Sequence, residues 1–504
     1  MDLLASLELG LVTALSAENL LYCVLGVSLG MLIGVLPGIG HLAAISMLMP
    51  LTYHVPTPAS LIMLAGIYYG AQYGGSIASI LLNLPGTASS AIICLDGYPM
   101  TRQGRAGVAL FMTTIASFLG SLIAIAVLIA LAPPLARVAL TFGSADYFAM
   151  MVLGLVAAGL LVQGPALLGA ASVVIGLLIG LVGTDVNTGA LRFTFGVPHL
   201  FDGVSIIALA MALFGVTEIV ASIGKVKPAG AGSGPITFRS LLPTRADLTS
   251  SVAPVLRGAG VGTAVGILPG AGGGAMAAFM AYAVEKRASK TPERFGKGAL
   301  AGITGPESAN NAAAQSAFIP TLTLGIPGDA VMALMLGALL IHGVQPGPRV
   351  VTDSPDLFWG LVMSFLIGNL ILLVLNIPLI RLWVTILRIP YRLLFPSIVL
   401  LIVVGVYSVS SSYVDVLTVA LFGLVGTLMV AMGFEPAPLL LGYVLGPLIE
   451  ENFRRALLVS NGDLTTFVAR PVSAAFLALS LALIAWVAVS ALRGRSRAAQ
   501  AASP

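Results

Sequence analysis

The stretch GVLPGIG at residues 34–40 is matched by GILPGAG at residues 266–272, and both lie inside long apolar sequence. Each is followed further along the chain by a second Pro-Gly break, at residues 83–87 and 327–329. Because proline lacks a backbone N–H and glycine is a poor helix former, each pair interrupts the helix that its surroundings predict. Open backbone at membrane depth is tolerated only where it is buried in protein or lines a polar cavity. Such breaks, paired in two halves of one chain, indicate the substrate site of a transporter.

The composition predicts an all-α polytopic membrane protein. The chain has 504 residues, of which 58% are hydrophobic and 9% charged, whereas soluble domains carry about 25% charged residues. Several long tracts contain no Asp, Glu, Lys or Arg, among them residues 19–95, 147–184, 357–380, 393–414 and 471–492. Since a spanning helix needs about 20 apolar residues, we expect about 12 transmembrane segments, counting broken helices. The net charge of +4 comes from cations in short loops, so no nucleic-acid partner is expected.

The basic loops predict how the chain is divided. The predicted parts are a first half, a basic cytoplasmic linker, a second half, and a last helix with a basic tail, at residues 1–221, 222–257, 258–470 and 471–504. Because cytoplasmic loops collect Lys and Arg, a second basic loop at 285–297 belongs on the same side as the linker. The uncharged segment 258–284 must then enter and leave on one side, since two crossings need about 40 residues. It predicts a re-entrant hairpin with its break near 269–274.

The first half predicts the mirror arrangement. The residues before 19 and the segment 52–60 carry no Lys or Arg, which places both on the periplasmic side. A first re-entrant hairpin, with its break near 37–40, then enters from the opposite face. Two similar segments that enter from opposite sides form an inverted repeat. In the same region Gly26, Gly30 and Gly34 recur at every fourth residue, which favours close helix packing over chemistry.

Uncharged hydrogen-bonding groups crowd beside both later breaks. A buried amide or hydroxyl without a partner costs about 1–3 kcal/mol, so these groups predict either another helix or a polar ligand as their neighbour. The segments that begin after Gly86 and Gly328 present helix N-termini, whose free N–H groups suit a carboxylate. The candidate substrate-binding residues are Tyr73, Ser76, Asn83, Pro85, Gly86, Thr87, Asn310, Asn311, Gln315, Pro327 and Gly328.

The same regions offer oxygen atoms for a coupling cation. Carbonyls freed at the hairpin breaks suit a hard ion such as Na⁺, and no Lys or Arg lies in either polar cluster to balance an anionic substrate. Glu307 and Asp329 are the only carboxylates there, and either could bind Na⁺ or H⁺. The alternatives are a helix N-cap for Asp329 and an exposed cap after Gly305-Pro306 for Glu307. The candidate ion-coupling residues are Gly38, Gly40, Gly270, Gly272, Glu307, Ser308 and Asp329. No other metal and no cofactor is expected.

Two long runs carry a family resemblance: GVLPGIG…LLNLPGTASSAIICLDGYPMTRQGRAGVAL, and GILPGAGGG…GPESANNAAAQSAFIPTLTLGIPGDAVMALMLGALLIHGVQPGP. Over about residues 26–470 the chain resembles the large membrane subunit of the tripartite tricarboxylate transporters, the TctA type. The resemblance implies import of a carboxylate, citrate among the candidates, across the bacterial inner membrane by an ion gradient. It also implies two partners, a small membrane subunit of about four helices and a periplasmic solute-binding protein.

The resemblance further implies an elevator-like mechanism, in which a domain with both hairpins moves against a fixed scaffold. Carried over to this sequence, the hairpin tips are Pro37-Gly38 and Pro269-Gly270. The polar break segments are residues 83–87 and 327–329. A homodimer is compatible with this arrangement.

Other classes of membrane protein fit the sequence less well. A primary pump needs a Walker motif, and the chain has no G-x-x-x-x-G-K-S/T. An intramembrane enzyme needs paired carboxylates or a Ser/His pair, whereas the acids here are scattered, so no enzymatic activity is expected. An anion-conducting channel or another non-enzymatic pore is the remaining alternative, because broken hairpins also occur in channels.

Overall fold

The structure is a computed structural model that describes residues 3–36, 39–162, 164–185, 187–222, 238–270, 273–387 and 391–501. It is almost entirely helical. Among the described residues, the helices long and apolar enough to span a membrane are α2 (Ala17–Val35), α6 (Ala106–Ala139), α18 (Pro355–Asn376), α21 (Tyr413–Ala431) and, over Pro471–Ser490, α24 (Pro471–Ala501). The all-α membrane class is therefore confirmed, while the total of about 12 segments stays a prediction.

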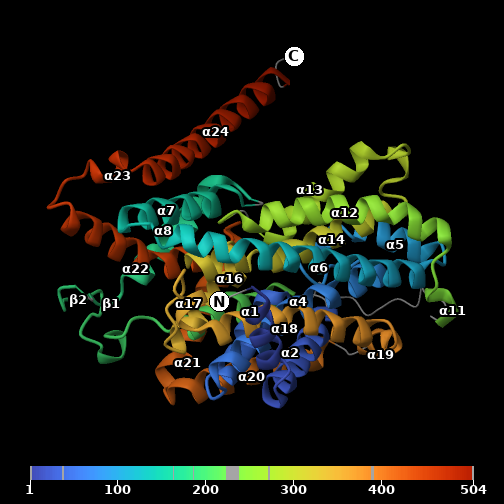
Figure 1. The fold of residues 1–504 in the computed structure, drawn as a ribbon, viewed down its shortest axis with the longest axis horizontal. Coiled ribbons are helices and arrows are strands. Elements are labelled where there is room, and N and C mark those ends of the chain that lie inside the picture. The colour runs from blue at the N-terminus through green and yellow to red at the C-terminus, as the bar shows by residue number, and fades with distance from the viewer. Residues whose placement is uncertain are drawn as a thin grey trace. The chain divides into compact units, whose positions relative to one another are not determined.

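The chain forms two compact units, whose helices and strands are labelled in Figure 1. Unit 1 comprises residues 1–137, 205–268 and 273–428, and unit 2 comprises residues 138–204, 269–272 and 429–504. Each unit draws on both of the predicted halves, so the boundary between compact units does not fall at the predicted linker.

Unit 1 contains most of the helices. Besides α2, α6, α18 and most of α21, its elements are α1 (Leu3–Ala14), α3 (His41–Thr52), α4 (Thr57–Leu82), η1 (Ser89–Ala91), α5 (Cys94–Arg102), α9 (Ile206–Ala210), the π-helical turn η3 (Met211–Val216), α10 (Thr217–Ser222), α11 (Phe238–Leu241), α12 (Arg245–Ile267), α13 (Gly273–Ala288), η4 (Pro292–Arg294), α14 (Ala301–Ser316), α15 (Phe318–Leu324), α16 (Ala330–Ile341), α17 (Val350–Asp353), α19 (Ile380–Ile386) and α20 (Tyr391–Ser410).

Two helical hairpins have their breaks at the two motifs that the sequence singles out. The first is α2 and α3, separated by residues 36–40, of which Pro37 and Gly38 lie outside the described residues. The second is α12 and α13, which lie side by side in Figure 1 and are separated by residues 268–272. Gly272 also lies outside the described residues. The re-entrant path of both hairpins across the membrane stays a prediction.

The second hairpin begins earlier in the chain than the sequence indicated. Residues 245–257, assigned to the linker, form the first turns of α12. A capping box starts this helix: the Asp247 N–H donates to Thr244 Oγ1 (3.1 Å), and the Thr244 N–H donates to Asp247 Oδ2 (3.0 Å). Residues 223–237 of the predicted linker lie outside the described residues.

A glycine stripe brings α2 against α4. A Cβ atom at Gly26, Gly30 or Gly34 would clash with backbone atoms of α4, which are those of Met63, Ile67 and Ala71 respectively. Both helices therefore approach as closely as their main chains allow, which is how small residues act at membrane helix interfaces. The prediction that this stripe serves packing is confirmed.

The second half repeats this contact between α12 and α14. A Cβ at three glycines of α12 would clash with the backbone of α14, and the pairs are Gly258 with Gly305, Gly262 with Ala309, and Gly266 with Ala313. In both helix pairs the contact advances four residues at a time, about one helical turn. One packing unit thus occurs twice within unit 1.

A buried carboxylate ties α5 to the loop before α14. Asp96 is fully buried, and its Oδ1 accepts hydrogen bonds from the backbone N–H groups of Gly296 (2.9 Å), Gly298 (2.8 Å) and Ala299 (2.7 Å). Its Oδ2 accepts a hydrogen bond from Tyr282 Oη (3.0 Å). Four donors on one carboxylate fix residues 296–299 to α5, because hydrogen bonds to a charged acceptor are the strong ones.

We expect Asp96→Asn to destabilise unit 1 by about 3 kcal/mol, since the charge that four donors face is removed without a change in size. The measurement is thermal unfolding of the purified chain in detergent. Glu293→Gln is the matched control, because Glu293 is exposed on the same loop and pairs with no described residue. Equal melting temperatures for the two variants would contradict this role of Asp96.

Unit 2 is built on α7 (Ser144–Leu160), α8 (Ala166–Gly180), α22 (Pro436–Val459), α23 (Thr466–Ala469) and α24, with η2 (Pro198–Leu200) and a small antiparallel hairpin of β1 (Gly183–Thr184) and β2 (Leu191–Arg192). Asp146 of α7 is buried and accepts from Arg470 Nε (2.9 Å) and from the Ser473 N–H (3.1 Å), which fixes the start of α24. Gly270, with φ +71°, packs against Gly154 and Ala157 of α7.

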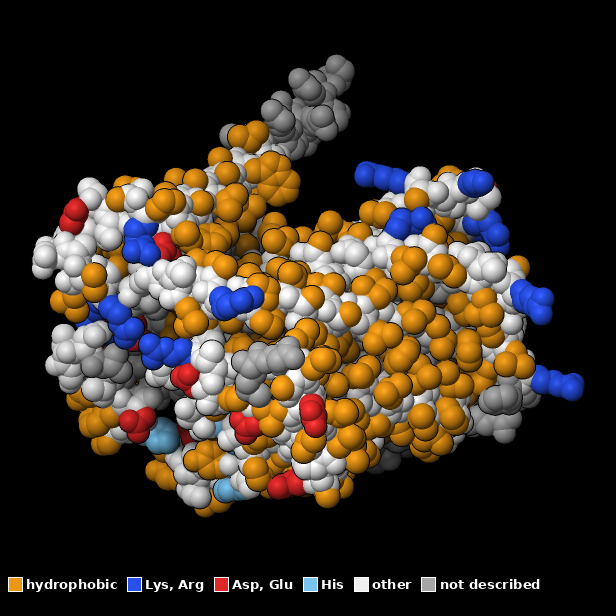
Figure 2. Space-filling view, in the orientation of Figure 1, with side chains coloured by type: hydrophobic (Ala, Val, Ile, Leu, Met, Phe, Trp, Pro, Cys, Tyr) orange, Lys and Arg blue, Asp and Glu red, His pale blue; other side chains and the backbone are white. Residues whose placement is uncertain are grey.

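Exposed apolar side chains cover much of the outer surface of unit 1, as Figure 2 shows around α6. The largest of them on α2, α6 and α18 are Leu21, Val24, Leu25, Leu119, Leu122, Leu131, Leu370 and Val374. Soluble monomers rarely expose apolar patches of this kind. Acyl chains of a bilayer are a fitting neighbour for this surface, in agreement with the membrane class.

Candidate functional site

The candidate site is a polar centre inside unit 1, where α4 and α14 carry hydrogen-bonding side chains into the interior. α4 is buried from Ala59 to Leu81, although it includes Gln72, Tyr73 and Ser76. α14 is buried from Gly302 to Ser316, although it includes the run GPESANNAAAQS. The glycine stripes explain this burial, because they let a second helix cover each polar one closely.

A chain of hydrogen bonds links the first Pro-Gly break to α14. Thr87 Oγ1 lies 3.0 Å from Ser89 Oγ, and Ser89 Oγ donates to Gln72 Oε1 (2.9 Å). The same Gln72 oxygen accepts from Asn310 Nδ2 (3.2 Å). The structure thus brings together Thr87 and Asn310, two predicted site residues from different halves of the chain.

Glu307 lies at the centre of a second group. It is 1% exposed, and its Oε1 accepts from Ser117 Oγ of α6 (2.9 Å) and from Asn311 Nδ2 (3.2 Å). Because α14 begins at Ala301, Glu307 lies within the helix and not at an exposed helix start, so the alternative of an exposed cap is wrong. A buried carboxylate inside a membrane protein is a functional candidate by default.

Asp329 is the N-cap of α16, which is the role that the sequence offered as an alternative to ion binding. Its Oδ1 accepts from the Met332 N–H (2.8 Å), and its Oδ2 accepts from Tyr68 Oη (3.4 Å). A Cβ at Gly273 would clash with the same carboxylate, so the start of α13 lies against it. The N-terminus of α16, where the sequence suggested a substrate carboxylate, is therefore occupied by a carboxylate of the chain itself.

Several buried polar atoms of this centre have no hydrogen-bond partner among the described residues. They are Ser76 Oγ, Ser121 Oγ, Glu307 Oε2, Asn310 Oδ1, Asn311 Oδ1, Gln315 Oε1 and Gln315 Nε2. Ser76 lies near the Glu307 carboxylate and Ser121 lies near Tyr73, but neither pair meets the geometry of a hydrogen bond. Leaving such atoms unpaired costs about 1–3 kcal/mol each. Oxygen atoms dominate the set, which is the donor type that a hard cation prefers.

The two breaks differ in exposure. At the first, Asn83 and Pro85 are exposed, and Asn83 closes α4 in the left-handed conformation with φ 57°. At the second, Gly325 closes α15 with φ 69°, and Pro327 and Gly328 are buried. Asn83 therefore lies at an accessible turn and not inside the buried hydrogen-bond network.

Gly86 and Gly328, the glycines of the two later breaks, make corresponding contacts with the two hairpins. The carbonyl of Gly34 is close to where a Cβ at Gly86 would lie, and the carbonyl of Gly266 is 3.4 Å from where a Cβ at Gly328 would lie. Each break thus lies against the end of its own hairpin. After Gly86 the chain forms the three-residue η1 and then, from Cys94, α5, so the expected helical segment begins with a 3₁₀ turn.

The remaining ion-coupling candidates are Ser308, Gly40, Gly270, Gly38 and Gly272. Ser308 donates to the Val255 carbonyl (2.8 Å) and so joins α14 to α12. Gly40 has open space where a Cβ would lie. Gly270 belongs to unit 2, and Gly38 and Gly272 are outside the described residues.

Sequence reasoning missed two partners of the polar centre. Ser117 of α6 bonds Glu307 (2.9 Å), and Asn369 of α18 accepts from Tyr73 Oη (3.0 Å). Both lie in apolar helices that contain no Leu-Pro-Gly or Ile-Pro-Gly break. The only signal in the sequence was the Asn residue itself, because an Asn in a spanning helix usually forms a hydrogen bond with another helix. That signal does not say which helix the partner comes from.

The fold and this centre define a helical membrane protein whose interior holds polar groups between broken helices. Residues 20–441 match the family described as "Tripartite tricarboxylate transporter TctA family". The chain therefore belongs to that family, which is a family of transporters and agrees with the resemblance stated above.

Two proteins of Agrobacterium vitis are similar to this chain. One, named "Uncharacterized 52.8 kDa protein in TAR-I ttuC' 3'region", is 49% identical over 495 residues, which cover 98% of each chain. The other, named "Uncharacterized protein in TAR-II ttuC' 3'region", is 51% identical over 234 residues, or 46% of this chain and 96% of that protein. No solved structure matches the chain.

Proposed function

We propose that this chain is the large subunit of an ion-gradient-driven importer that moves a tricarboxylate or dicarboxylate across the bacterial inner membrane. Membership of the TctA family supports a tripartite transporter. The observation that supports a ligand site in this chain is the set of unpartnered polar atoms on α4, α6 and α14. The free-energy cost of leaving these atoms without hydrogen bonds is offset if a polar substrate and its cation occupy the space beside them.

The chemistry of this set favours joint binding of an anion and a cation. Glu307 Oε2, Asn310 Oδ1 and Asn311 Oδ1 are acceptors that suit Na⁺ or a proton. The Gln315 side-chain amide is a donor that suits a carboxylate, since its Nε2 has no partner among the described residues. Because the polar runs of α4 and α14 contain no Lys or Arg, the cation balances the charge of the substrate. Glu307 is the favoured coupling residue, and Asp329 is the second candidate.

An inverted repeat with an elevator-like motion is the proposed mechanism. The repeated glycine contact of α2 with α4 and of α12 with α14 supports two related halves. In the proposed cycle, a periplasmic binding protein delivers the carboxylate, the coupling ion binds beside it, and a domain motion exposes both to the cytoplasm. The proposed assembly also contains a small membrane subunit of about four helices.

Transport in proteoliposomes distinguishes this proposal from an anion channel. The chain is reconstituted with its small membrane subunit and the binding protein, and the uptake of radiolabelled citrate and of other tri- and dicarboxylates is followed. An importer shows saturation, counterflow against unlabelled substrate, and accumulation that depends on a Na⁺ or H⁺ gradient. Linear conductive flux without counterflow would support the channel instead.

Asn83 tests whether the exposed first break touches the substrate. Asn83→Gly keeps the left-handed turn, because glycine adopts positive φ without cost, but removes the amide. We expect uptake by this variant to fall about tenfold, the loss typical of one good hydrogen bond. Asn83→Ala also removes the amide, and it adds backbone strain because alanine disfavours the positive φ at this position. Normal uptake by the Gly variant together with poor uptake by the Ala variant would assign Asn83 a turn role only.

A further inference from the structure

A second site candidate lies in unit 1 at the base of the α12–α13 hairpin. A pocket of about 300 Å³ opens there, lined by residues from the start of α6, the first half of α12, the end of α13, η4 and the start of α14. Most of the lining residues belong to the basic linker 222–257 and the basic loop 285–297, which the sequence places on the cytoplasmic side. The volume is at the lower end of the range for ligand pockets, about 300–1,000 Å³.

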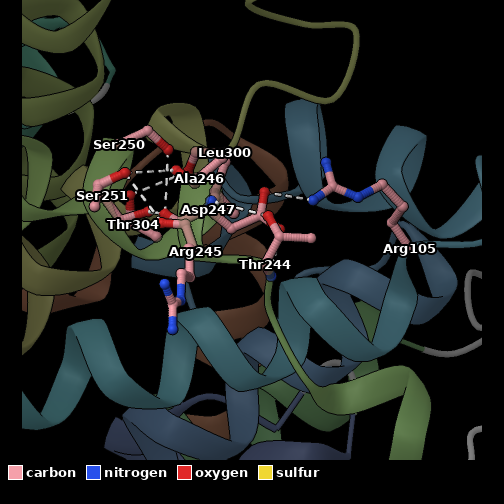
Figure 3. Close-up of polar contacts among 10 residues, drawn as sticks. Arg105, Thr244, Arg245, Ala246, Asp247, Ser250, Ser251, Leu300 and Thr304 are labelled. Carbon is pink, nitrogen blue, oxygen red and sulfur yellow. Dashed lines mark hydrogen bonds and ion pairs between the residues drawn. The ribbon is translucent and has the colours of Figure 1, made fainter.

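Three arginines from three separate segments line this pocket: Arg105, Arg257 and Arg294. Two acids, Asp247 and Glu285, also line it, so one positive charge is in excess. Figure 3 shows the Arg105 side chain extending toward the Asp247 carboxylate, with Thr244 beside the same carboxylate. Burial raises the pKa of Asp247, but hydrogen bonds from Arg105 and Thr244 outweigh it and hold that pKa below its ordinary value.

The acids use only part of what the arginines offer. A guanidinium has five N–H donors. Arg105 donates to Asp247 through Nη2 (2.6 Å), and Arg257 donates to Glu285 through Nε (2.8 Å) and Nη2 (2.6 Å). Arg294 is exposed and pairs with no acid among the described residues. Most of the donors in the pocket thus remain free for a further acceptor.

The pocket is held in shape by contacts that do not depend on a ligand. The Asp96 carboxylate fixes Gly296, Gly298 and Ala299, and Ala299 is part of the pocket wall. The Glu285 side chain is 2% exposed and is bound bidentately by Arg257, which joins α12 to α13. The pocket therefore keeps its shape and its one positive charge in excess without a ligand, and both favour an anion.

We propose that this pocket binds a phosphate-type oxyanion. A phosphate carries acceptor oxygens on all sides, which suits guanidiniums that come from three directions, and arginine binds it with paired hydrogen bonds. The Thr291 hydroxyl at the wall adds a further donor. Two sources offer this chemistry, a free phosphate compound of the cytoplasm and the headgroup of an anionic phospholipid. The inference is independent of the proposed transport cycle.

Two binding experiments on the full chain test the proposal. In the first, inorganic phosphate is titrated into the chain in nanodiscs of phosphatidylcholine, and binding is measured by calorimetry. In the second, the nanodiscs contain phosphatidylglycerol as well, and the retained phosphatidylglycerol is counted by native mass spectrometry. The test variant is Arg294→Gln, and the control is Arg287→Gln, which removes the same charge from the exposed end of α13 outside the pocket.

We expect Arg294→Gln to weaken phosphate binding or phosphatidylglycerol retention by about tenfold, the loss typical of a charge-assisted hydrogen bond, while Arg287→Gln changes neither. A loss in the first experiment assigns the site to a free phosphate, and a loss confined to the second assigns it to a lipid headgroup. Equal losses for both variants would show diffuse attraction by the basic loops and overturn the proposal. No binding by the unmodified chain in either experiment would overturn it as well.

Discussion

A chain with Glu307→Gln is expected to lose ion-driven accumulation of its carboxylate by about tenfold or more, the range of a lost coupling free energy between two ligands. Glutamine keeps the size of the side chain and the Oε1 acceptor that Ser117 and Asn311 bind at 2.9 Å and 3.2 Å. It replaces Oε2, which has no partner among the described residues. The change therefore removes a charge and a cation ligand and leaves the contacts of α14 with α6 in place.

Accumulation and exchange must be measured separately for this variant. If Glu307 binds the coupling ion, accumulation fails while counterflow of substrate between equal concentrations persists, because exchange needs no net movement of the ion. Melting temperature in detergent serves as the check on folding. Accumulation equal to that of the unmodified chain would exclude Glu307 from ion coupling.

Asp329→Asn is the matched comparison for Glu307→Gln. Asn caps helices about as well as Asp, so the hydrogen bond from the Met332 N–H to the N-cap persists. If capping is the main task of Asp329, this variant keeps its accumulation while Glu307→Gln loses it. The reverse result would transfer the coupling role from Glu307 to Asp329.

Local sequence was enough to locate the breaks, because their cause is local. Adjacent Pro and Gly residues strongly disfavour continuation of a helix, so the ends of α2, α4, α12 and α15 fall beside the LPG, NLPG and GIPG motifs. The burial of the polar run in α14 followed in the same way from polar side chains in an apolar chain. The glycine stripe of α2 was also readable, since small residues at every fourth position leave one helix face open to close contact.

Hydrogen-bond partners that lie far apart in the chain could not be predicted from the sequence. No motif around Asp96 indicates its partners, yet it accepts hydrogen bonds from three N–H groups some two hundred residues away, at Gly296, Gly298 and Ala299. Ser117 is one of several Ser and Thr residues in the apolar α6, and only the packing of α6 on α14 makes it the partner of Glu307. No periodicity or motif encodes such pairs, because they depend on which helices become neighbours.

Substituting alanine at two neighbouring glycines of α12 is expected to change stability in opposite directions. A Cβ at Gly262 would lie 2.7 Å from the Ala309 Cα, so Gly262→Ala pushes α12 away from α14 and destabilises unit 1 by about 1–3 kcal/mol or more. A Cβ at Gly260 meets nothing within 4 Å, so Gly260→Ala stabilises the helix by about 0.5–1 kcal/mol through better helix propensity. Both effects are measured as melting temperatures in detergent.

The equivalent change in the other helix pair tests the repeat itself. Gly30 contacts the Ile67 backbone as Gly262 contacts that of Ala309, so Gly30→Ala should lower the melting temperature by a similar amount. Since the hairpin ends lie against the Pro-Gly breaks, with Gly34 beside Gly86 and Gly266 beside Gly328, both variants should also impair uptake. A stable Gly30→Ala chain beside an unstable Gly262→Ala chain would mean that the two contacts look alike but do not hold the two helix pairs together equally.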